Sequence, residues 1–155
     1  MAQENNIILN RTTSDNPDFR KLVVELDRHL HKVFGVQQDF YDTLNVIENC
    51  DTVVVAYCDG VPAGCGALRP YDEEKIEVKR MYAAEQYRGM GIATAVLHKL
   101  EQWAKELGYK AIILETGTLL APANAFYKKE GYMLTEKWGQ YVDAENSVCM
   151  KKSIV

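Results

Sequence analysis

The chain lacks the features of two large classes of protein. No run of about 18 apolar residues occurs in its 155 positions, so no segment resembles a membrane-spanning helix. Basic residues are not in excess: 18 Lys and Arg stand against 22 Asp and Glu, a formal net charge of −4, and the cations are scattered. Proteins that bind nucleic acid usually carry a basic stripe. We therefore expect neither a membrane protein nor a nucleic-acid-binding protein.

Metal ligands and disulfide patterns are also scarce. His29 and His31 would lie on different sides of a helix and cannot share a metal ion. The N-terminus is polar and lacks the hydrophobic segment of a signal peptide. We expect no bound metal, and free thiols in a reducing cytoplasm. The chain has four cysteines, none in a C-x-x-C pair: Cys50, Cys58, Cys65 and Cys149.

The composition that remains is that of one globular domain spanning 1–155. Apolar residues make up 47% of the chain and charged residues 26%. Apolar residues with helical spacing predict helices over 19–34, 92–107 and 122–130, with a shorter helix over 37–47. Alternating or continuous apolar segments predict strands over 7–11, 51–57, 61–69, 75–83, 111–114, 132–136 and 148–152.

This order of elements predicts a mixed α/β fold with a central, mostly antiparallel sheet. Asp59-Gly60 is a strong hairpin signal within the antiparallel first half. The second half contains a β-α-β crossover. The alternation of apolar and polar residues slips between Val78 and Met81, which predicts a β-bulge in that strand.

The segment 86–93 is the most informative part of the chain. Gly89 and Gly91 directly precede the strongest predicted helix, where free N–H groups and the helix dipole favour a phosphate. An ordinary glycine-containing turn is the alternative. The segment lacks the Gly-Lys-Ser/Thr of a P-loop, and Thr94 stands where a dinucleotide fingerprint requires Gly or Ala.

Four segments together resemble the GCN5-related N-acetyltransferase (GNAT) family. They are Ile76–Tyr82, the Gln86-x-x-Gly89-x-Gly91-Ile92-Ala93 loop, Leu114-Glu115-Thr116, and Asn124–Tyr132. Each segment alone is modest, but their order and spacing are specific. The resemblance implies the acyl-CoA N-acyltransferase fold. It also implies that the acetyl group of acetyl-CoA, as co-substrate, passes directly to an amine of a small molecule or a protein.

The resemblance also implies the residues that hold acetyl-CoA. The backbone of Met81 and Tyr82 would pair with the pantetheine arm, and Asn124 would contact the pantetheine or a phosphate. Tyr127 would lie near the sulfur and donate a proton to the departing thiolate, although an aromatic core residue is the alternative. The pyrophosphate would be held by the backbone of the loop: Arg88, Gly89, Met90, Gly91, Ile92 and Ala93.

The base that accepts the proton of the amine is left open. Glu77 lies on the strand where some members of the family carry such a base, and Glu115 is its rival. Glu77 could also be a solvated strand residue beside two lysines. The acceptor pocket is expected from residues 30–41 and 137–147, with these candidates: Phe34, Asp39, Phe40, Tyr41 and Tyr141. A non-catalytic acyl-CoA-binding sensor is the alternative function, and relatives in the family often form homodimers.

Overall fold

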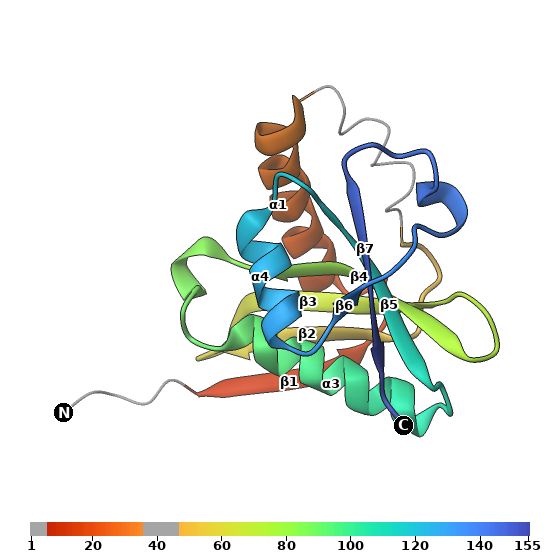
Figure 1. Ribbon diagram of the computed structural model, residues 1–155. Helices are drawn as coiled ribbons and strands as arrows, with labels where there is room; N and C mark the ends of the chain where they lie inside the picture. The colour runs from red at the N-terminus through yellow and green to blue at the C-terminus, as the bar shows by residue number, and fades with distance from the viewer. Residues whose placement is uncertain (1–5, 36–46) are drawn as a thin grey trace.

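A computed structural model of the protein describes residues 6–35 and 47–155 (Figure 1). Within them the chain forms one seven-stranded sheet of order β1-β2-β3-β4-β5-β7-β6. No helix in this part of the chain is long and apolar enough to cross a membrane. The strands are β1 (Ile7–Thr12), β2 (Val53–Cys58), β3 (Val61–Pro70), β4 (Lys75–Ala83), β5 (Ala111–Gly117), β6 (Met133–Leu134) and β7 (Ser147–Ser153). The helices are α1 (Pro17–Phe34), α3 (Ile92–Glu106) and α4 (Ala121–Lys129), with short 3-10 helices η2 (Glu85–Tyr87) and η3 (Gly139–Tyr141).

Helix α1 forms where the sequence predicts it. The Asn16 side chain accepts a hydrogen bond from the backbone N–H of Asp18 at 2.8 Å, and Pro17 occupies the first turn. The helix ends at Gly35. Its apolar face places Phe19 and Leu22 against one face of the sheet. The shorter helix predicted over 37–47 falls, apart from its last position, outside the described residues.

Helices α3 and α4 cover the opposite face of the sheet (Figure 1). Val54 and Ala56 of β2 belong to the core beneath α3, whereas Val53 and Val55 belong to the core beneath α1, as the alternation of a strand requires. Helix α3 packs very closely because β3 carries glycines here. A Cβ on Gly66 would lie 2.7 Å from Leu100 Cδ1.

The predicted β-bulge is confirmed in β4. Cys65 of β3 pairs with Tyr82 and Ala67 pairs with Lys79, so two residues of β4 oppose the single Gly66. Arg80, one of these two, has a φ of 57°. Its guanidinium lies 2.5 Å from the Asp27 carboxylate of α1. The left-handed residue is therefore anchored to the helix behind the sheet.

Strands β4 and β5 separate just before this bulge. They are the only parallel neighbours in the described sheet, and their pairing runs from Lys75–Ala111 to Val78–Leu114. Strand β4 then continues to Ala83 beside β3, while β5 continues to Gly117 beside β7. Figure 1 shows that β5 and β7 run at a steep angle to β1–β4. The sheet is thus split between β4 and β5.

The strand predicted over 132–136 is shorter than expected. Only Met133 and Leu134 form β6. Gly131, with a φ of 95°, ends α4, and the Tyr132 N–H donates back to the Tyr127 carbonyl at 2.9 Å. Tyr132 therefore belongs to the end of the helix, because its N–H closes the last helical turn.

Candidate active site

A cavity of about 130 Å³ lies at the split between β4 and β5. Residues from both faces of the sheet line it, so it passes through the sheet where the two strands no longer pair. Apolar, charged and aromatic side chains line it. Its lining is Leu26 and Leu30 of α1, Glu77–Met81 of β4, Glu115–Gly117 of β5, Leu120, Ala123 and Tyr127 around α4, and Tyr141 of η3.

The side of the cavity toward α1 holds a buried group of charged residues. Ile76 and Val78 pack beneath α3, so the alternation of β4 turns Glu77 and Lys79 to the other face. These two residues are only 3% and 5% exposed. The reading of Glu77 as a solvated strand residue is therefore wrong, because α1 and the segment around η3 cover this face of the strand.

Every oxygen of the Glu77 carboxylate has a partner. Oε2 accepts a hydrogen bond from the Tyr141 hydroxyl at 3.0 Å and lies 3.4 Å from the Lys79 ammonium. Oε1 lies 3.4 Å from the Arg69 guanidinium. Lys79 Nζ in turn donates to the Tyr141 hydroxyl at 2.5 Å. The carboxylate is thus held between two cations and a hydroxyl.

Glu115 lies on β5, on the same face of the sheet as Glu77, but its surroundings differ from those of Glu77. Burial raises the pKa of the Glu115 carboxyl from 4.5 to about 7, although a hydrogen bond with Ser147 and the charge of Lys79 oppose the shift. A carboxyl with a pKa near neutrality exchanges a proton readily at physiological pH. Such a pKa suits a group that accepts a proton near neutral pH.

Tyr127 faces the cavity from α4. Its ring packs edge-on against Phe126 and Tyr132, with ring centroids 5.1 and 5.8 Å away. Burial, and then the negative charge of Glu115, raise the pKa of the Tyr127 phenol above its usual 10. The hydroxyl therefore stays protonated and remains a hydrogen-bond donor. The same residue serves both as part of the core and as a group that lines the cavity.

Asn124 lies one turn before Tyr127, but its side chain is engaged with the backbone. Its amide nitrogen donates to the carbonyl oxygens of Gly117 and Leu120, both at 2.9 Å. These bonds tie the end of β5 to the start of α4. The structure thus assigns Asn124 a role in shaping the connection. A contact with the cofactor stays a prediction.

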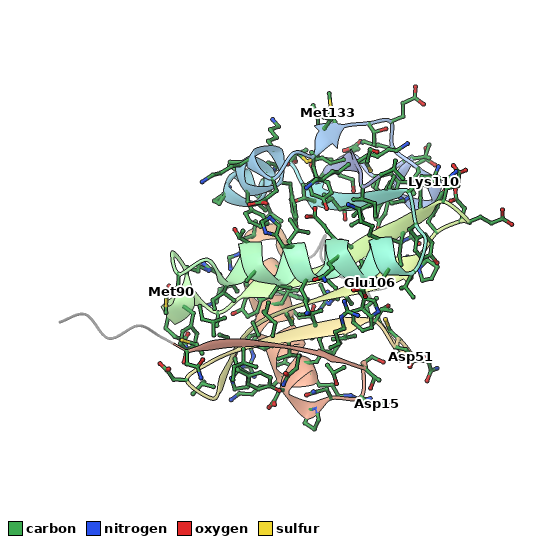
Figure 2. The ribbon with its side chains drawn as sticks, turned by 90° about the horizontal axis from the view of Figure 1, so that it is seen from below. Asp15, Asp51, Met90, Glu106, Lys110 and Met133 are labelled. Carbon is green, nitrogen blue, oxygen red and sulfur yellow. The ribbon has the colours of Figure 1, made fainter. Side chains whose placement is uncertain are left out.

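The glycine loop leads into α3 with the backbone that the sequence predicts. Gly89 and Gly91 have φ values of 82° and 78°. A Cβ added at either position would meet no atom within 4 Å, so both glycines border open space. Figure 2 shows Met90 at the N-terminal end of α3, opposite Glu106 at its other end. The first turn of a helix carries N–H groups without intrahelical acceptors, and the loop leaves room for an anion there.

The structure brings some of the predicted residues together and leaves others apart. Glu77, Met81 and Tyr127 line the cavity, whereas the loop 88–93 and Asn124 lie outside its lining. The Tyr82 hydroxyl donates to Glu25 of α1 at 3.3 Å. Asp39, Phe40 and Tyr41, as well as the Phe34 side chain, lie outside what the structure describes.

Sequence reasoning missed Lys79 and Leu26, whereas Leu30 lies within the range 30–41 that was expected to form the acceptor pocket. The only available signal for Lys79 was its spacing of two from Glu77, which puts both residues on one face of a strand next to the predicted bulge. Leu26 carried no signal, since core residues of an amphipathic helix have the same spacing. Tyr141 was expected in the acceptor pocket and does line the cavity.

Comparisons with known proteins agree with this geometry. The profile of the family described as "Acetyltransferase (GNAT) family" matches residues 15–132. An IAA acetyltransferase of Azospirillum brasilense is 32% identical over 136 residues, which are 86% of this chain and 89% of that protein. The chain belongs to the GNAT family of acetyltransferases.

Solved structures show the same fold over almost the whole chain. A GNAT acetyltransferase of Staphylococcus aureus Mu50 superposes with a TM-score of 0.78 at 16% identity, covering 97% of this chain and 100% of that one. A GNAT acetyltransferase of Elizabethkingia anophelis, solved with acetyl-CoA bound, gives 0.70 at 19% identity, covering 97% and 99%. These structures show the mixed α/β fold, and the family match and the Azospirillum relative show an acetyl-CoA-dependent acetyltransferase.

Proposed function

We propose that the protein transfers the acetyl group of acetyl-CoA directly to an amine that enters the cavity from the α1 side. The observation that carries this proposal is the cavity itself, which passes through the sheet between Tyr127 on one face and Glu115 on the other. A thioester placed between these groups would meet a hydroxyl donor at its sulfur and a base at the attacking nitrogen. No covalent acetyl-enzyme is needed for such a transfer.

Glu115, and not Glu77, would take the proton of the amine. An alkyl ammonium group with a pKa near 10.4 must lose a proton before its nitrogen can attack. Glu115 has a pKa raised to about 7 by burial, which suits that transfer. Glu77 is already bound to Arg69, Lys79 and Tyr141. We assign it to holding Tyr141 over the cavity.

Acetyl-CoA would lie along β4 from the cavity to the start of α3. The pantetheine arm would pair with the backbone of Met81 and Tyr82, which lie beyond the last residue of β4 that pairs with β5. The pyrophosphate would bind the N–H groups of residues 88–93, with Arg88 nearby. The catalytic gain would come mostly from holding two substrates in line, together with hydrogen bonds to the reacting atoms.

A thiol-release assay with a panel of amines tests the proposed function. The panel should contain alkyl and aromatic amines, amino acids, peptides with free amines, and IAA, because one relative is named for it. We expect CoA release that depends on one class of acceptor. Tight binding of acetyl-CoA without release on any acceptor would instead support a non-catalytic acyl-CoA sensor.

Gly89→Val tests the pyrophosphate loop. A β-branched residue is disfavoured at a φ of 82°, and its side chain would occupy the open space above the N–H groups. We expect the dissociation constant for acetyl-CoA, measured by calorimetry, to rise at least tenfold, which is roughly 1.4 kcal/mol. Gly108→Val is the matched control, because Gly108 has a φ of 92° and open space at the far end of the same helix. Equal binding by both variants would remove the loop's proposed role.

The thiols favour a reducing compartment. All four cysteines are free, and three of them are buried. Burial raises the pKa of Cys65 to about 12 and that of Cys149 to about 11, which makes both thiols unreactive. We propose a cytoplasmic location, because free cysteines are typical of a reducing compartment, and we propose that 1–155 acts as one catalytic domain.

A further inference from the structure

The cavity contains an amine that belongs to the protein itself. Lys79 lies directly before the bulge residue Arg80, and its side chain is 3% exposed. It lines the same cavity as Met81 of the split and Tyr127 of α4. The proposed transfer of acetyl to an external amine gives this lysine no chemical step. Its functional group is nevertheless the one that such an enzyme acetylates.

The surroundings of Lys79 favour a reactive amine. Burial lowers the pKa of the Lys79 ammonium group below its usual 10.5, although the Glu77 carboxylate opposes the shift. A lowered pKa increases the fraction of neutral, nucleophilic amine. Two polar groups lie close to its nitrogen: the Tyr141 hydroxyl at 2.5 Å and Glu77 Oε2 at 3.4 Å.

Stability alone gives little reason for an ion pair at this place. Burying a carboxylate and an ammonium group costs desolvation energy that their attraction often only balances. An apolar pair of similar volume would fill the strand face as well. The flexible four-carbon stem of lysine also allows its nitrogen to move within the cavity.

We propose that Lys79 is a self-acetylation site, at which the Nζ atom takes the acetyl group of acetyl-CoA bound to the same chain. The inference rests on the proposed function in one respect, since the thioester must reach the cavity. A second amine substrate is not required. In the absence of an external acceptor, the chain would modify its own lysine.

The chemistry balances with the groups present. The ammonium group gives one proton to Glu115, the carboxyl group proposed as the base, whose charge acts on Lys79, and the proton then passes to solvent. The neutral nitrogen attacks the carbonyl carbon, a C–N bond forms, and the C–S bond breaks with its electron pair left on sulfur. The second nitrogen-bound proton goes to that thiolate. The products are an acetamide on Lys79, free CoA thiol and one released proton.

Acetylation would change the cavity in two ways. The amide carries no charge, so Glu77 would retain Arg69 as its cationic partner and lose Lys79. The added acetyl group would also occupy part of a cavity of only about 130 Å³. We therefore expect the modified enzyme to turn over external amines more slowly than the unmodified enzyme.

The test is incubation of the full chain with acetyl-CoA that carries an isotope-labelled acetyl group, followed by mass spectrometry of the intact protein and its peptides. We expect one label per chain, located on Lys79, with a rate that saturates with acetyl-CoA and is independent of protein concentration. Excess CoA should block the labelling. Lys79→Arg should abolish it, whereas Lys75→Arg, at the start of the same strand, should not.

Two results would overturn the inference. The first is no label on Lys79. The second is label on Lys79 at a rate that rises linearly with acetyl-CoA and is not blocked by CoA, as expected for direct chemical acetylation of an exposed lysine such as Lys110. The amine panel separates this failure from failure of the proposed function. CoA release on an external amine without label on Lys79 would leave the proposed function standing, whereas absence of acetyl-CoA binding would remove both.

Discussion

Glu115→Gln should lower kcat by about 10²- to 10³-fold, the range expected for loss of a general base. The substitution keeps the size of the side chain and its hydrogen-bonding capacity toward Ser147 but removes the group that accepts a proton. The wild-type rate should fall about tenfold per pH unit below a pH of about 7, the raised pKa of Glu115. The variant should lack this limb of the profile. Steady-state kinetics over a range of pH measures both effects.

Glu77→Gln is the matched control for this substitution. It makes the same chemical change on the other carboxyl group that lines the cavity. We expect the limb near pH 7 to persist in this variant, because Glu77 holds Tyr141 and Lys79 in place and does not take the proton. Loss of the limb in Glu77→Gln, with retention in Glu115→Gln, would make Glu77 the base.

The same pKa shift predicts a change in stability with a definite sign. The folded state raises the pKa of Glu115, so it binds the proton more tightly than the unfolded chain does. The wild type should therefore lose unfolding free energy as pH rises from 4.5 to about 7, by at most about 3 kcal/mol. Glu115→Gln should remove this loss. Denaturant unfolding measured at both ends of that range should show that the free energy of unfolding of the variant, relative to that of the wild type, is greater at the higher pH.

Tyr127→Phe should slow turnover by about 10- to 100-fold. A hydrogen bond to a charged group contributes roughly 1.5–3 kcal/mol, and the phenol would donate such a bond to the departing thiolate. Because burial keeps the pKa of Tyr127 above 10, its hydroxyl is protonated throughout the working range. We expect the loss in kcat with a small change in the dissociation constant for acetyl-CoA, measured by stopped-flow kinetics and calorimetry.

Tyr132→Phe is the control that distinguishes catalysis from packing. Tyr132 is a buried neighbour whose ring contacts that of Tyr127. Its hydroxyl, however, donates to Glu101 of α3 at 2.8 Å and does not line the cavity. We expect Tyr132→Phe to lower thermal stability and leave kcat nearly unchanged. Equal rates in wild type and Tyr127→Phe, within a factor of about two, would return Tyr127 to the aromatic core alone.

Local patterns predicted most of the secondary structure. The apolar spacing of α3, the hairpin at Asp59-Gly60 and the bounds of β4 all follow from interactions within a few residues along the chain. The bulge was also visible, because an extra residue shifts the alternation of a strand. The length of β6 was not predictable, since it depends on where the turn after α4 closes. That turn is set by the Tyr132 N–H and the Tyr127 carbonyl.

The residues of the site likewise fall into those that the sequence indicated and those that depend on tertiary contacts. The resemblance to the GNAT family indicated the glycine loop and Tyr127 as candidate residues, and it left two carboxyl groups as rivals for the base. The sequence could not rank Glu77 against Glu115, because the pKa and the partners of each depend on residues far away in the chain. Tyr141 reaches Glu77 across a separation of 64 positions.

By itself, the sequence determined the type of most helices and strands, since short-range spacing carries that information, and its resemblance to the GNAT family indicated the class of reaction. Only the tertiary structure decided that both faces of β4 are buried and where β4 and β5, the parallel neighbours, part. It also decided that an ionisable lysine and two carboxyl groups share one cavity. The physical reason is that the burial and charge pairing of these side chains depend on contacts between α1, β4, β5 and η3. The local sequence of any one of these elements does not specify such contacts.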